Sequence, residues 1–276
     1  GDWENQKTPS TSNPDDILAG LRGLGRGMDG GRKALPPGTT RSVHPDGYEE
    51  INVPAREPGP IAAGERSVAI EELDEWAQPA FRGISTLNRI QSKIFPQAYH
   101  TNDNLLVCAP TGAGKTNIAM LTILHEIGLH IDENGEYLPE DFKIVYVAPM
   151  KALAAEVTEA FSRRLAPLNI VVAELTGDTQ MSKRELEETQ MIVTTPEKWD
   201  VITRKGGEVS IASTLRLLII DEVHLLNDER GPVIETLVAR TLRQVEQTQS
   251  MIRIIGLSAT LPNPMDVAQF LGVNKD

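Results

Sequence analysis

A length of 276 residues allows one large domain, alone or with an appendage. The 27 Lys and Arg against 39 Asp and Glu give a net charge of −12. This balance excludes a simple polycationic nucleic-acid binder, but not a protein that uses backbone amides and a few local cations. The single cysteine, Cys108, excludes an internal disulfide and a multi-cysteine zinc site and favours a reducing compartment. No apolar run approaches the roughly 18 residues of a membrane span and residues 1–4 lack a signal-peptide pattern, so we expect a soluble protein with no membrane partner.

The first quarter of the chain differs in composition from the rest. Residues 1–65 hold 11 of the 22 glycines and 8 of the 18 prolines, so they carry little apolar surface to offset chain entropy. We predict an N-terminal extension over 1–65, largely disordered over 1–34. Residues 35–60 have more pattern and could add one extended edge strand around 48–54, because their prolines keep this segment out of a central strand. The folded domain is expected over 66–276.

From residue 66 onward, short apolar runs alternate with helical periodicities, which predicts an α/β fold of parallel strands joined by crossover helices. Several runs are apolar at nearly every position, as expected for strands that are covered by helices on both faces. The predicted strands are 104–109, 143–148, 170–175, 191–194, 215–221 and 252–258. Helices are predicted after residue 114, around Leu153, Val157 and Phe161, after a capping box formed by Ser182 and Glu185, and after Pro232.

The strongest chemical motif lies between the first of these strands and the helix that follows it. Gly112 and Gly114 carry no side chain, so backbone N–H groups can surround a phosphate at the positive end of the helix. Lys115 is expected to reach the β- and γ-phosphates, and Thr116 to bind Mg²⁺. We therefore predict a site for ATP and Mg²⁺ rather than a turn that merely ends a strand. Its loop residues are Ala109, Pro110, Thr111, Gly112, Ala113, Gly114, Lys115 and Thr116.

Two adjacent carboxylates follow the apolar run 215–220. Asp221 and Glu222 are unfavourable at the end of a buried strand unless a cation is present. We predict that this strand neighbours the phosphate loop, that Asp221 holds Mg²⁺ partly through water, and that Glu222 accepts a proton from the water attacking the γ-phosphate. The catalytic residues would then be Lys115, Asp221 and Glu222. The alternative, an Asp that only caps the next helix, loses weight because the phosphate loop is also present.

These motifs and their order resemble the DExH helicases of superfamily two. The resemblance rests first on Ala-x-x-Gly-x-Gly-Lys-Thr at 109–116, Asp-Glu-Val-His at 221–224 and Ser-Ala-Thr at 258–260. Four further segments are similar to motifs of the same helicases: 87–91, 148–153, 176–178 and 195–198. The resemblance implies a RecA-like P-loop NTPase domain, with a mainly parallel sheet sandwiched by helices, that hydrolyses ATP on nucleic acid.

The resemblance also implies roles for individual residues. Gln91 would read the adenine edge. A surface for single-stranded RNA or DNA would bind phosphates and sugars rather than base edges, through Pro149, Lys151, Thr176, Thr195 and Pro196. The residues that would couple the ATP site to domain closure are His224, Ser258, Ala259 and Thr260.

Longer runs at 195–200, 224–233 and 256–263 are similar to Superkiller-like helicases with two tandem cassettes. Within that group, 161–165 and 247–254 are nearest to the first cassette of a branch that works in a transcription-coactivator complex, and next to a spliceosomal branch. The resemblance implies 3′-to-5′ translocation and a location in nucleus and cytoplasm. It also implies work on collided ribosomes, in transcription coactivation and in alkylation repair, together with other subunits of a complex.

Related motors bind ATP between two RecA-like domains, and the second supplies an arginine finger worth about 10³–10⁵ in rate. Residues 1–276 contain the motifs of the first domain only. We therefore expect them, by themselves, to bind nucleotide weakly, to hydrolyse ATP slowly and not to unwind duplexes.

Three alternatives remain open. A GTPase shares the phosphate loop, and 274–276 has a superficial likeness to a guanine-reading motif, but His224 stands where a GTPase needs glycine. A scaffold could bind ATP without turning it over, although the catalytic residues are present. A spliceosomal helicase cassette would use the same chemistry in a different complex.

Overall fold

The computed structural model describes residues 40–43, 48–52, 66–108, 114–138, 141–177, 179–204, 209–222 and 252–259. For 40–43, 48–52, 203–204, 209–210 and 212 only the backbone is described. The predicted disorder of residues 1–34 and the helix predicted after Pro232 lie outside these residues.

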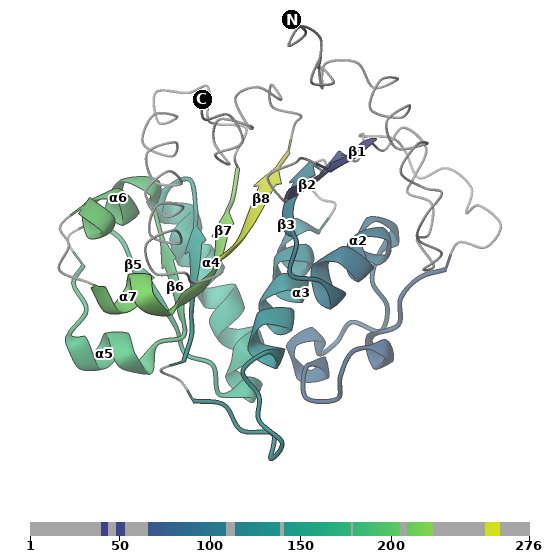
Figure 1. The fold of residues 1–276 in the computed structure, drawn as a ribbon, viewed down its shortest axis with the longest axis horizontal. Helices are drawn as coiled ribbons and strands as arrows, with labels where there is room; N and C mark the ends of the chain where they lie inside the picture. The colour runs from purple at the N-terminus through teal and green to yellow at the C-terminus, as the bar shows by residue number, and fades with distance from the viewer. Residues whose placement is uncertain are drawn as a thin grey trace, which may run out of the picture.

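The strands form one mixed sheet in the order β1-β2-β3-β8-β7-β4-β6-β5 (Figure 1). Every neighbouring pair is parallel except β1 with β2. The predicted α/β fold with a mainly parallel sheet is therefore confirmed, and the six strands expected after residue 66 are all present, with ends that differ from the prediction by at most two residues. The strands are β1 Thr40–Val43, β2 Tyr48–Asn52, β3 Asn104–Cys108, β4 Lys143–Val147, β5 Val172–Leu175, β6 Met191–Thr194, β7 Leu215–Ile220 and β8 Arg253–Ser258.

The N-terminal extension contributes two strands rather than the single edge strand that we expected. β2 pairs in parallel with β3, and β1 pairs antiparallel with β2, so β1 forms the edge of the sheet. β2 runs from Tyr48 to Asn52. The expectation was wrong because Pro45 precedes this strand and Pro54 follows it, so neither proline removes one of its ladder hydrogen bonds.

Helices cover both faces of the sheet (Figure 1). Successive strand residues alternate between the faces, so that Leu105 and Val107 join one buried cluster while Leu106 and Cys108 join the other. The larger cluster includes residues of α2, α3 and α4, and the smaller one includes residues of α5, α6 and α7. The helix bounds are α2 Arg89–His100, α3 Lys115–Gly128, α4 Lys151–Leu165, α5 Lys183–Glu188, α6 Pro196–Arg204 and α7 Val209–Thr214, with short 3₁₀ turns η1 Ile70–Glu72, η2 Gln78–Phe81 and η3 Ala166–Leu168.

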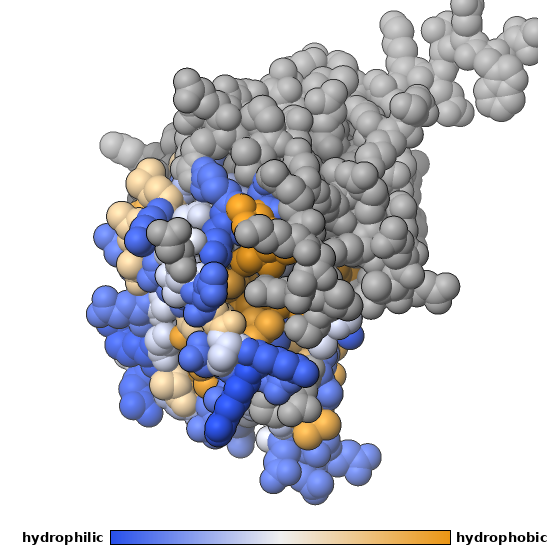
Figure 2. Space-filling model, turned by 90° about the vertical axis from the view of Figure 1, so that its left-hand side faces the viewer, coloured by the Kyte–Doolittle hydropathy of each residue, from blue (hydrophilic) through white to orange (hydrophobic). Residues whose placement is uncertain are grey.

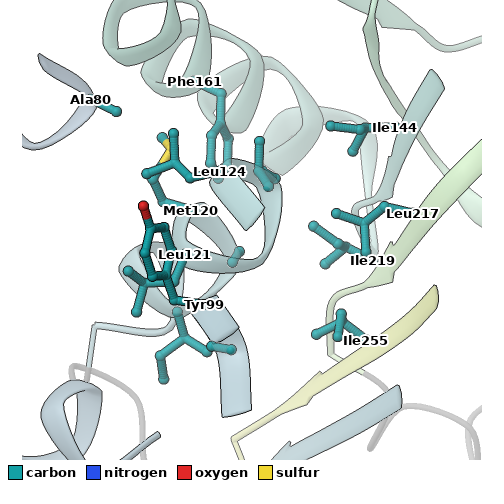
Figure 3. Close-up of a cluster of buried hydrophobic side chains, with 14 of the residues drawn as sticks. Ala80, Tyr99, Met120, Leu121, Leu124, Ile144, Phe161, Leu217, Ile219 and Ile255 are labelled. Atoms are coloured by element: carbon teal, nitrogen blue, oxygen red, sulfur yellow. The ribbon is translucent and has the colours of Figure 1, made fainter. Parts of the chain in front are cut away.

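Figure 3 shows how the larger cluster is built: side chains of α3 face those of β4, β7 and β8 across the interior. Met120 and Leu124 come from α3, and Ile144, Leu217 and Ile255 come from the sheet, each with at most 1% of its surface exposed. Complete burial of such a side chain contributes about 1.5–3 kcal/mol relative to leaving it in water. This packing fixes α3, whose first residue is Lys115, against β7, the strand that precedes the acidic residues.

Two helix starts are determined by local capping boxes. The hydroxyl of Ser182 accepts a hydrogen bond from the Glu185 N–H at 3.1 Å, as predicted for α5. At α2, the side chain of Asn88 accepts from the Gln91 N–H at 2.8 Å, and the Gln91 carboxamide accepts from the Asn88 N–H at 3.0 Å. The second box fixes the rotamer of Gln91 at the point where α2 approaches the phosphate loop.

A buried arginine joins β8 to the far end of α2. Arg253 is 4% exposed, and its guanidinium donates to the carbonyls of Asp103 at 2.7 Å, Ala98 at 3.2 Å and Gln97 at 2.9 Å. Burial lowers the pKa of Arg253 to about 10, so the group is still charged at neutral pH. It therefore acts as a C-terminal cap for α2 that is supplied from another element.

Figure 2 views the side of the molecule that carries α5, α6 and α7 in Figure 1, and shows mostly hydrophilic residues with a hydrophobic strip among them. None of the helices in the described part of the chain combines the length and the hydropathy that crossing a bilayer requires.

Candidate active site

The described residues include most of the predicted nucleotide site. Gln91, Gly114, Lys115 and Thr116 are described on the loop side, and Asp221 and Glu222 on the acidic side. Ser258 and Ala259 of the predicted coupling segment are described as well. The remaining predicted residues of these groups lie outside the described part of the chain: Ala109, Pro110, Thr111, Gly112, Ala113, His224 and Thr260.

The topology brings the ends of β3, β8 and β7 to the same edge of the sheet. Ser258 pairs with Cys108, and Gly256 pairs with Ile220, so the three strands end at nearly the same level. We had expected the acidic residues on the strand next to the phosphate loop, but β8 lies between β3 and β7. The order of strands is decided by crossover connections, which apolar runs do not encode. As a result, Ser258 lies at the end of β8, between the end of β3 and the end of β7 that leads to the acidic pair.

A side chain from the start of α3 and one from the turn after β7 meet at this edge of the sheet. The Lys115 ammonium lies 3.4 Å from Oε1 of Glu222, and the two side chains are 13% and 26% exposed. Lys115 is the first residue of α3, and Gly114 before it has φ 75°, in the left-handed region that favours glycine. Thr116, in the same first turn, is exposed. A cation, a hydroxyl and a carboxylate are therefore available at one place.

Glu222 has a backbone conformation that is unusual for a residue with a side chain. Its φ is 60°, and Asn169 is the only other non-glycine residue with a positive φ in the described part of the chain. Such a conformation costs on the order of 1–3 kcal/mol and persists where the surrounding structure enforces it. It turns the chain sharply just after β7, where the Glu222 carboxylate reaches Lys115.

Asp221 is held by the strand next to β7. Its backbone N–H donates to the carbonyl of Val147 at 3.0 Å, and its Oδ2 accepts a hydrogen bond from the Tyr146 hydroxyl at 2.7 Å. Burial raises the pKa of Asp221, as does the charge of Glu222, while the Tyr146 hydrogen bond and Lys115 lower it. Burial also raises the pKa of Tyr146 well above its ordinary value, so this hydroxyl keeps its proton and remains a donor. Nothing in the sequence pattern identified Tyr146 as part of the site.

The adenine-reading role of Gln91 stays a prediction, because both ends of its side chain are engaged within the protein. Besides the hydrogen bond from Asn88, the Gln91 amide nitrogen donates to the carbonyl of Gly114 at 3.0 Å. Gln91 is 3% exposed. In this state it supports the left-handed turn that precedes Lys115.

A hollow of about 600 Å³ lies at the ends of β5 and β6. Of the five residues predicted to contact nucleic acid, Lys151, Thr176 and Thr195 line it. The side chains of Pro149 and Pro196 are buried and lie outside the lining. Thr176 and Thr195 are themselves only 2% and 7% exposed, so Lys151 is the exposed cation of the predicted set.

The same hollow contains residues that the sequence reasoning missed, chiefly Lys198 and Gln180. The ammonium of Lys198 donates to the carbonyl of Gly177 at 2.9 Å. The signal that could have found Lys198 is its position in the first turn of α6, two residues after Pro196, which was already expected to contact phosphates and sugars. Helices α4 and α6 both begin beside this hollow, and their N-terminal N–H groups favour anions.

Within the described ranges, no group of three or more His, Cys, Asp and Glu side chains could hold a metal ion. Mg²⁺ keeps several waters and is usually bound by one or two protein ligands together with phosphates. A buried Asp221 with a raised pKa beside Glu222 is the kind of site that a divalent cation would stabilise. The residues present therefore fit a Mg²⁺-nucleotide held by Thr116 and Asp221.

Comparison with known proteins agrees with this geometry. The family model described as DEAD/DEAH box helicase matches residues 88–267. The chain is 67% identical over 243 residues to "DExH-box ATP-dependent RNA helicase DExH14" of Arabidopsis thaliana, covering 88% of this chain and 11% of that protein. It is 62% identical over 246 residues to "Activating signal cointegrator 1 complex subunit 3" of Homo sapiens, covering 89% and 11%. It is 55% identical over 245 residues to "U5 small nuclear ribonucleoprotein 200 kDa helicase" of Drosophila melanogaster, covering 89% and 11%.

Solved structures show the same fold at low identity. A chain of the helicase Mss116p bound to ssRNA and AMP-PNP has a TM-score of 0.65 and 18% identity, covering 80% of this chain and 45% of that one. The helicase MrfA bound to DNA has a TM-score of 0.63 and 24% identity, covering 75% and 28%. These matches and the sequence relatives confirm the resemblance seen in the motifs. The chain therefore belongs to the DEAD/DEAH box helicase family, and its described residues have the RecA-like fold.

Proposed function

We propose that the chain binds Mg²⁺-ATP between Lys115 and the acidic pair, and that the protein containing it translocates 3′-to-5′ on single-stranded RNA or DNA. The observation that carries the proposal is the approach of the Lys115 ammonium to within 3.4 Å of the Glu222 carboxylate. A cation for the β- and γ-phosphates and a base for the attacking water are the two groups that phosphoryl transfer requires.

The residues of the site have separate tasks in this scheme. Lys115 would leave Glu222 and bind the β- and γ-phosphates, which would free the Glu222 carboxylate to accept a proton from the attacking water. Thr116 and Asp221 would hold Mg²⁺, Asp221 partly through water. When bound, the ion neutralises charge that develops on the transferred phosphoryl group. Gln91, next to Gly114, would sense the nucleotide base.

The nucleic-acid strand would lie in the hollow at the ends of β5 and β6. Lys151 and Lys198 supply charge there, and the starts of α4 and α6 supply backbone N–H groups. Contacts of this kind position a sugar-phosphate backbone without reading its sequence. Ser258 and Ala259, between the phosphate loop and the acidic pair, together with His224 and Thr260, would couple the two sites.

The chain spans about one tenth of the curated relatives it matches, 11% in the case of the human one, so the activity of the whole protein is part of the proposal. A second RecA-like domain would supply an arginine finger, worth about 10³–10⁵ in rate. Residues 1–276 alone would therefore bind nucleotide weakly, hydrolyse it slowly and not unwind.

The similarity to "Activating signal cointegrator 1 complex subunit 3" supports a place in a corresponding complex. Work on collided ribosomes, in transcription coactivation and in alkylation repair, in both nucleus and cytoplasm, would follow from it. The similarity to the U5 helicase supports the alternative of a spliceosomal complex. Identification of the subunits that co-purify with the full-length protein would separate these two complexes.

Two substitutions test the nucleotide site in the longest protein that contains these residues. Lys115→Ala should weaken binding of a fluorescent ATP analogue and reduce ATP hydrolysis, because the phosphates lose their cation. Glu222→Gln should retain binding but reduce hydrolysis about 10²–10⁴-fold, the usual contribution of a general base. Arg184→Ala is a matched control, because it breaks an exposed Arg–Glu pair on α5 instead. Unchanged unwinding by the full-length protein after either substitution would favour the scaffold, and preference for GTP over ATP in competition would favour a GTPase.

A further inference from the structure

A tyrosine that belongs to none of the motifs contacts the acidic pair. Tyr146 lies in β4, is 3% exposed, and pairs with Ile219 of β7. Because side chains alternate along a strand, Asp221 projects on the same face of the sheet as Ile219 and Tyr146. The Tyr146 hydroxyl donates to Oδ2 of Asp221 at 2.7 Å. Tyr146 therefore approaches the predicted Mg²⁺ ligand from the adjacent strand.

The contact limits how the Asp221 carboxylate can rotate. The backbone of Asp221 is fixed by its N–H hydrogen bond to the carbonyl of Val147. A carboxylate has a broad torsional minimum about its last bond, so a hydrogen bond to one oxygen selects one orientation. Partners of this kind fix metal ligands in place, and their loss typically lowers metal affinity about 10–100-fold.

We propose that Tyr146 is a positioning residue that orients the carboxylate of Asp221 for the Mg²⁺ of a bound nucleotide. The inference rests on the proposed nucleotide site, since it concerns the ion held there. The rival explanation is that the hydroxyl only satisfies a buried carboxylate and contributes to the stability of the fold. The two explanations differ in what removal of the hydroxyl does to Mg²⁺ binding.

The chain offers a matched control for the purely structural explanation. Tyr99, at 4% exposure, donates its hydroxyl to Oδ2 of Asp74, which is the same chemistry outside the nucleotide site. Tyr146→Phe and Tyr99→Phe each remove the hydroxyl of a buried tyrosine that donates to an aspartate in a part-buried hydrogen bond, and each keeps the ring. Tyr146→Met removes the same hydroxyl with a flexible apolar side chain, so the test does not depend on a single substitution.

The experiment measures equilibrium binding of a fluorescent, non-hydrolysable ATP analogue while Mg²⁺ is titrated, with EDTA as the metal-free reference. Both Tyr146 variants should raise the Mg²⁺ concentration for half-maximal enhancement about 10–100-fold and leave binding in EDTA unchanged. Tyr99→Phe should leave the Mg²⁺ midpoint unchanged. Thermal unfolding of each variant reports the loss of stability separately from metal binding.

The double variant of Tyr146→Phe with Asp221→Asn completes the test. If Tyr146 acts through Asp221, removing its hydroxyl should change nothing further once the carboxylate is gone. An unchanged Mg²⁺ midpoint in folded Tyr146→Phe or Tyr146→Met would overturn the inference and leave the nucleotide site intact. Wild-type protein whose nucleotide binding does not respond to Mg²⁺ would overturn the proposed site itself.

Discussion

The ammonium of Lys115 lies 3.4 Å from the Glu222 carboxylate, although 107 positions separate the two residues in the chain. Lys115 is supplied by α3 after β3, and Glu222 by the turn after β7, with β8 between these strands. The Glu222 carboxylate is paired with the ammonium that would bind the β- and γ-phosphates of a nucleotide, and Lys115 is paired with the carboxylate that would accept a proton from the attacking water. The contact therefore brings two opposite charges together in a partly buried site, where each compensates the other.

The substitution Gly114→Ala tests whether the turn before Lys115 must be free of a side chain. A Cβ at this position would lie 2.1 Å from the amide nitrogen of Gln91, and φ is +75°. Gly114→Ala should therefore displace Gln91, weaken nucleotide binding at least about tenfold and destabilise the fold by roughly 1–2 kcal/mol from the left-handed conformation alone.

Gly135→Ala is the control for this prediction, because φ is +77° and nothing lies within 4 Å of the added Cβ. It should show the loss of stability with unchanged nucleotide binding. Denaturant unfolding and fluorescent-nucleotide titration measure the two effects. Equal nucleotide affinity in both variants would show that the approach of Gln91 has no role in the site.

Replacement of Lys151 or Lys198 by alanine should weaken nucleic-acid binding, and the loss should be similar for all nucleic-acid sequences. Each contributes one cation to the hollow at the ends of β5 and β6. Loss of one phosphate contact lowers the slope of log affinity against log salt by about 0.7 for a single strand. Fluorescence anisotropy with single-stranded oligonucleotides at several salt concentrations measures this slope. Lys183→Ala, an exposed lysine on α5, should leave it unchanged, and an equal effect there would contradict the proposed position of the strand.

Arg253 should contribute strongly to stability through the end of α2. Arg253→Met would leave the carbonyls of Gln97, Ala98 and Asp103 without their donor, so we expect a loss of about 3 kcal/mol in the free energy of unfolding. Arg216→Met is the comparison, because the Arg216 guanidinium also donates to backbone carbonyls but is partly exposed. It should lose less than about 1 kcal/mol. Chemical denaturation of both variants decides the matter, and similar losses would argue against the capping role.

His125 should make the fold less stable in mild acid. Burial lowers its pKa below the ordinary value of 6.5, so below that pH the unfolded chain binds a proton that the folded chain does not. The stability that the neutral His125 contributes to the fold is complete above about pH 6.5. It is lost as the pH falls towards the lowered pKa, by up to about 1.4 kcal/mol per pH unit in the free energy of unfolding. The free energy of unfolding at pH 7.5 and pH 5.5 should therefore fall less in His125→Gln than in the wild type. An identical fall in the two proteins would contradict the prediction, and His100→Gln, which replaces an exposed histidine, is the control.

The strands could be predicted because their signals are local. A run such as 215–220, apolar at all but one position, is stable only when helices cover both faces of its sheet, and this is where the structure places it. The start of α5 follows likewise from Ser182 and Glu185, which contact each other across one helical turn. Neither inference needed knowledge of a distant part of the chain.

The hollow at the ends of β5 and β6 shows where sequence reasoning was less complete. Motif similarity selected Pro149 and Pro196, whose side chains are buried, and missed Lys198, which lines the hollow. Exposure depends on what packs against a residue, so a motif can identify a segment without identifying the side chains that reach solvent.

What the sequence by itself determined is the chemistry: a loop for phosphates, a lysine, a hydroxyl and a pair of carboxylates at the ends of apolar strands. What only the tertiary structure decided is which of these meet. It placed β8 between β3 and β7, brought Lys115 to Glu222, and set the Tyr146 hydroxyl on Asp221. The reason is that strand order and cross-strand contacts arise from crossover connections and packing between residues far apart in the chain, whereas hydrophobic periodicity and motif spacing record only what neighbouring residues require of each other.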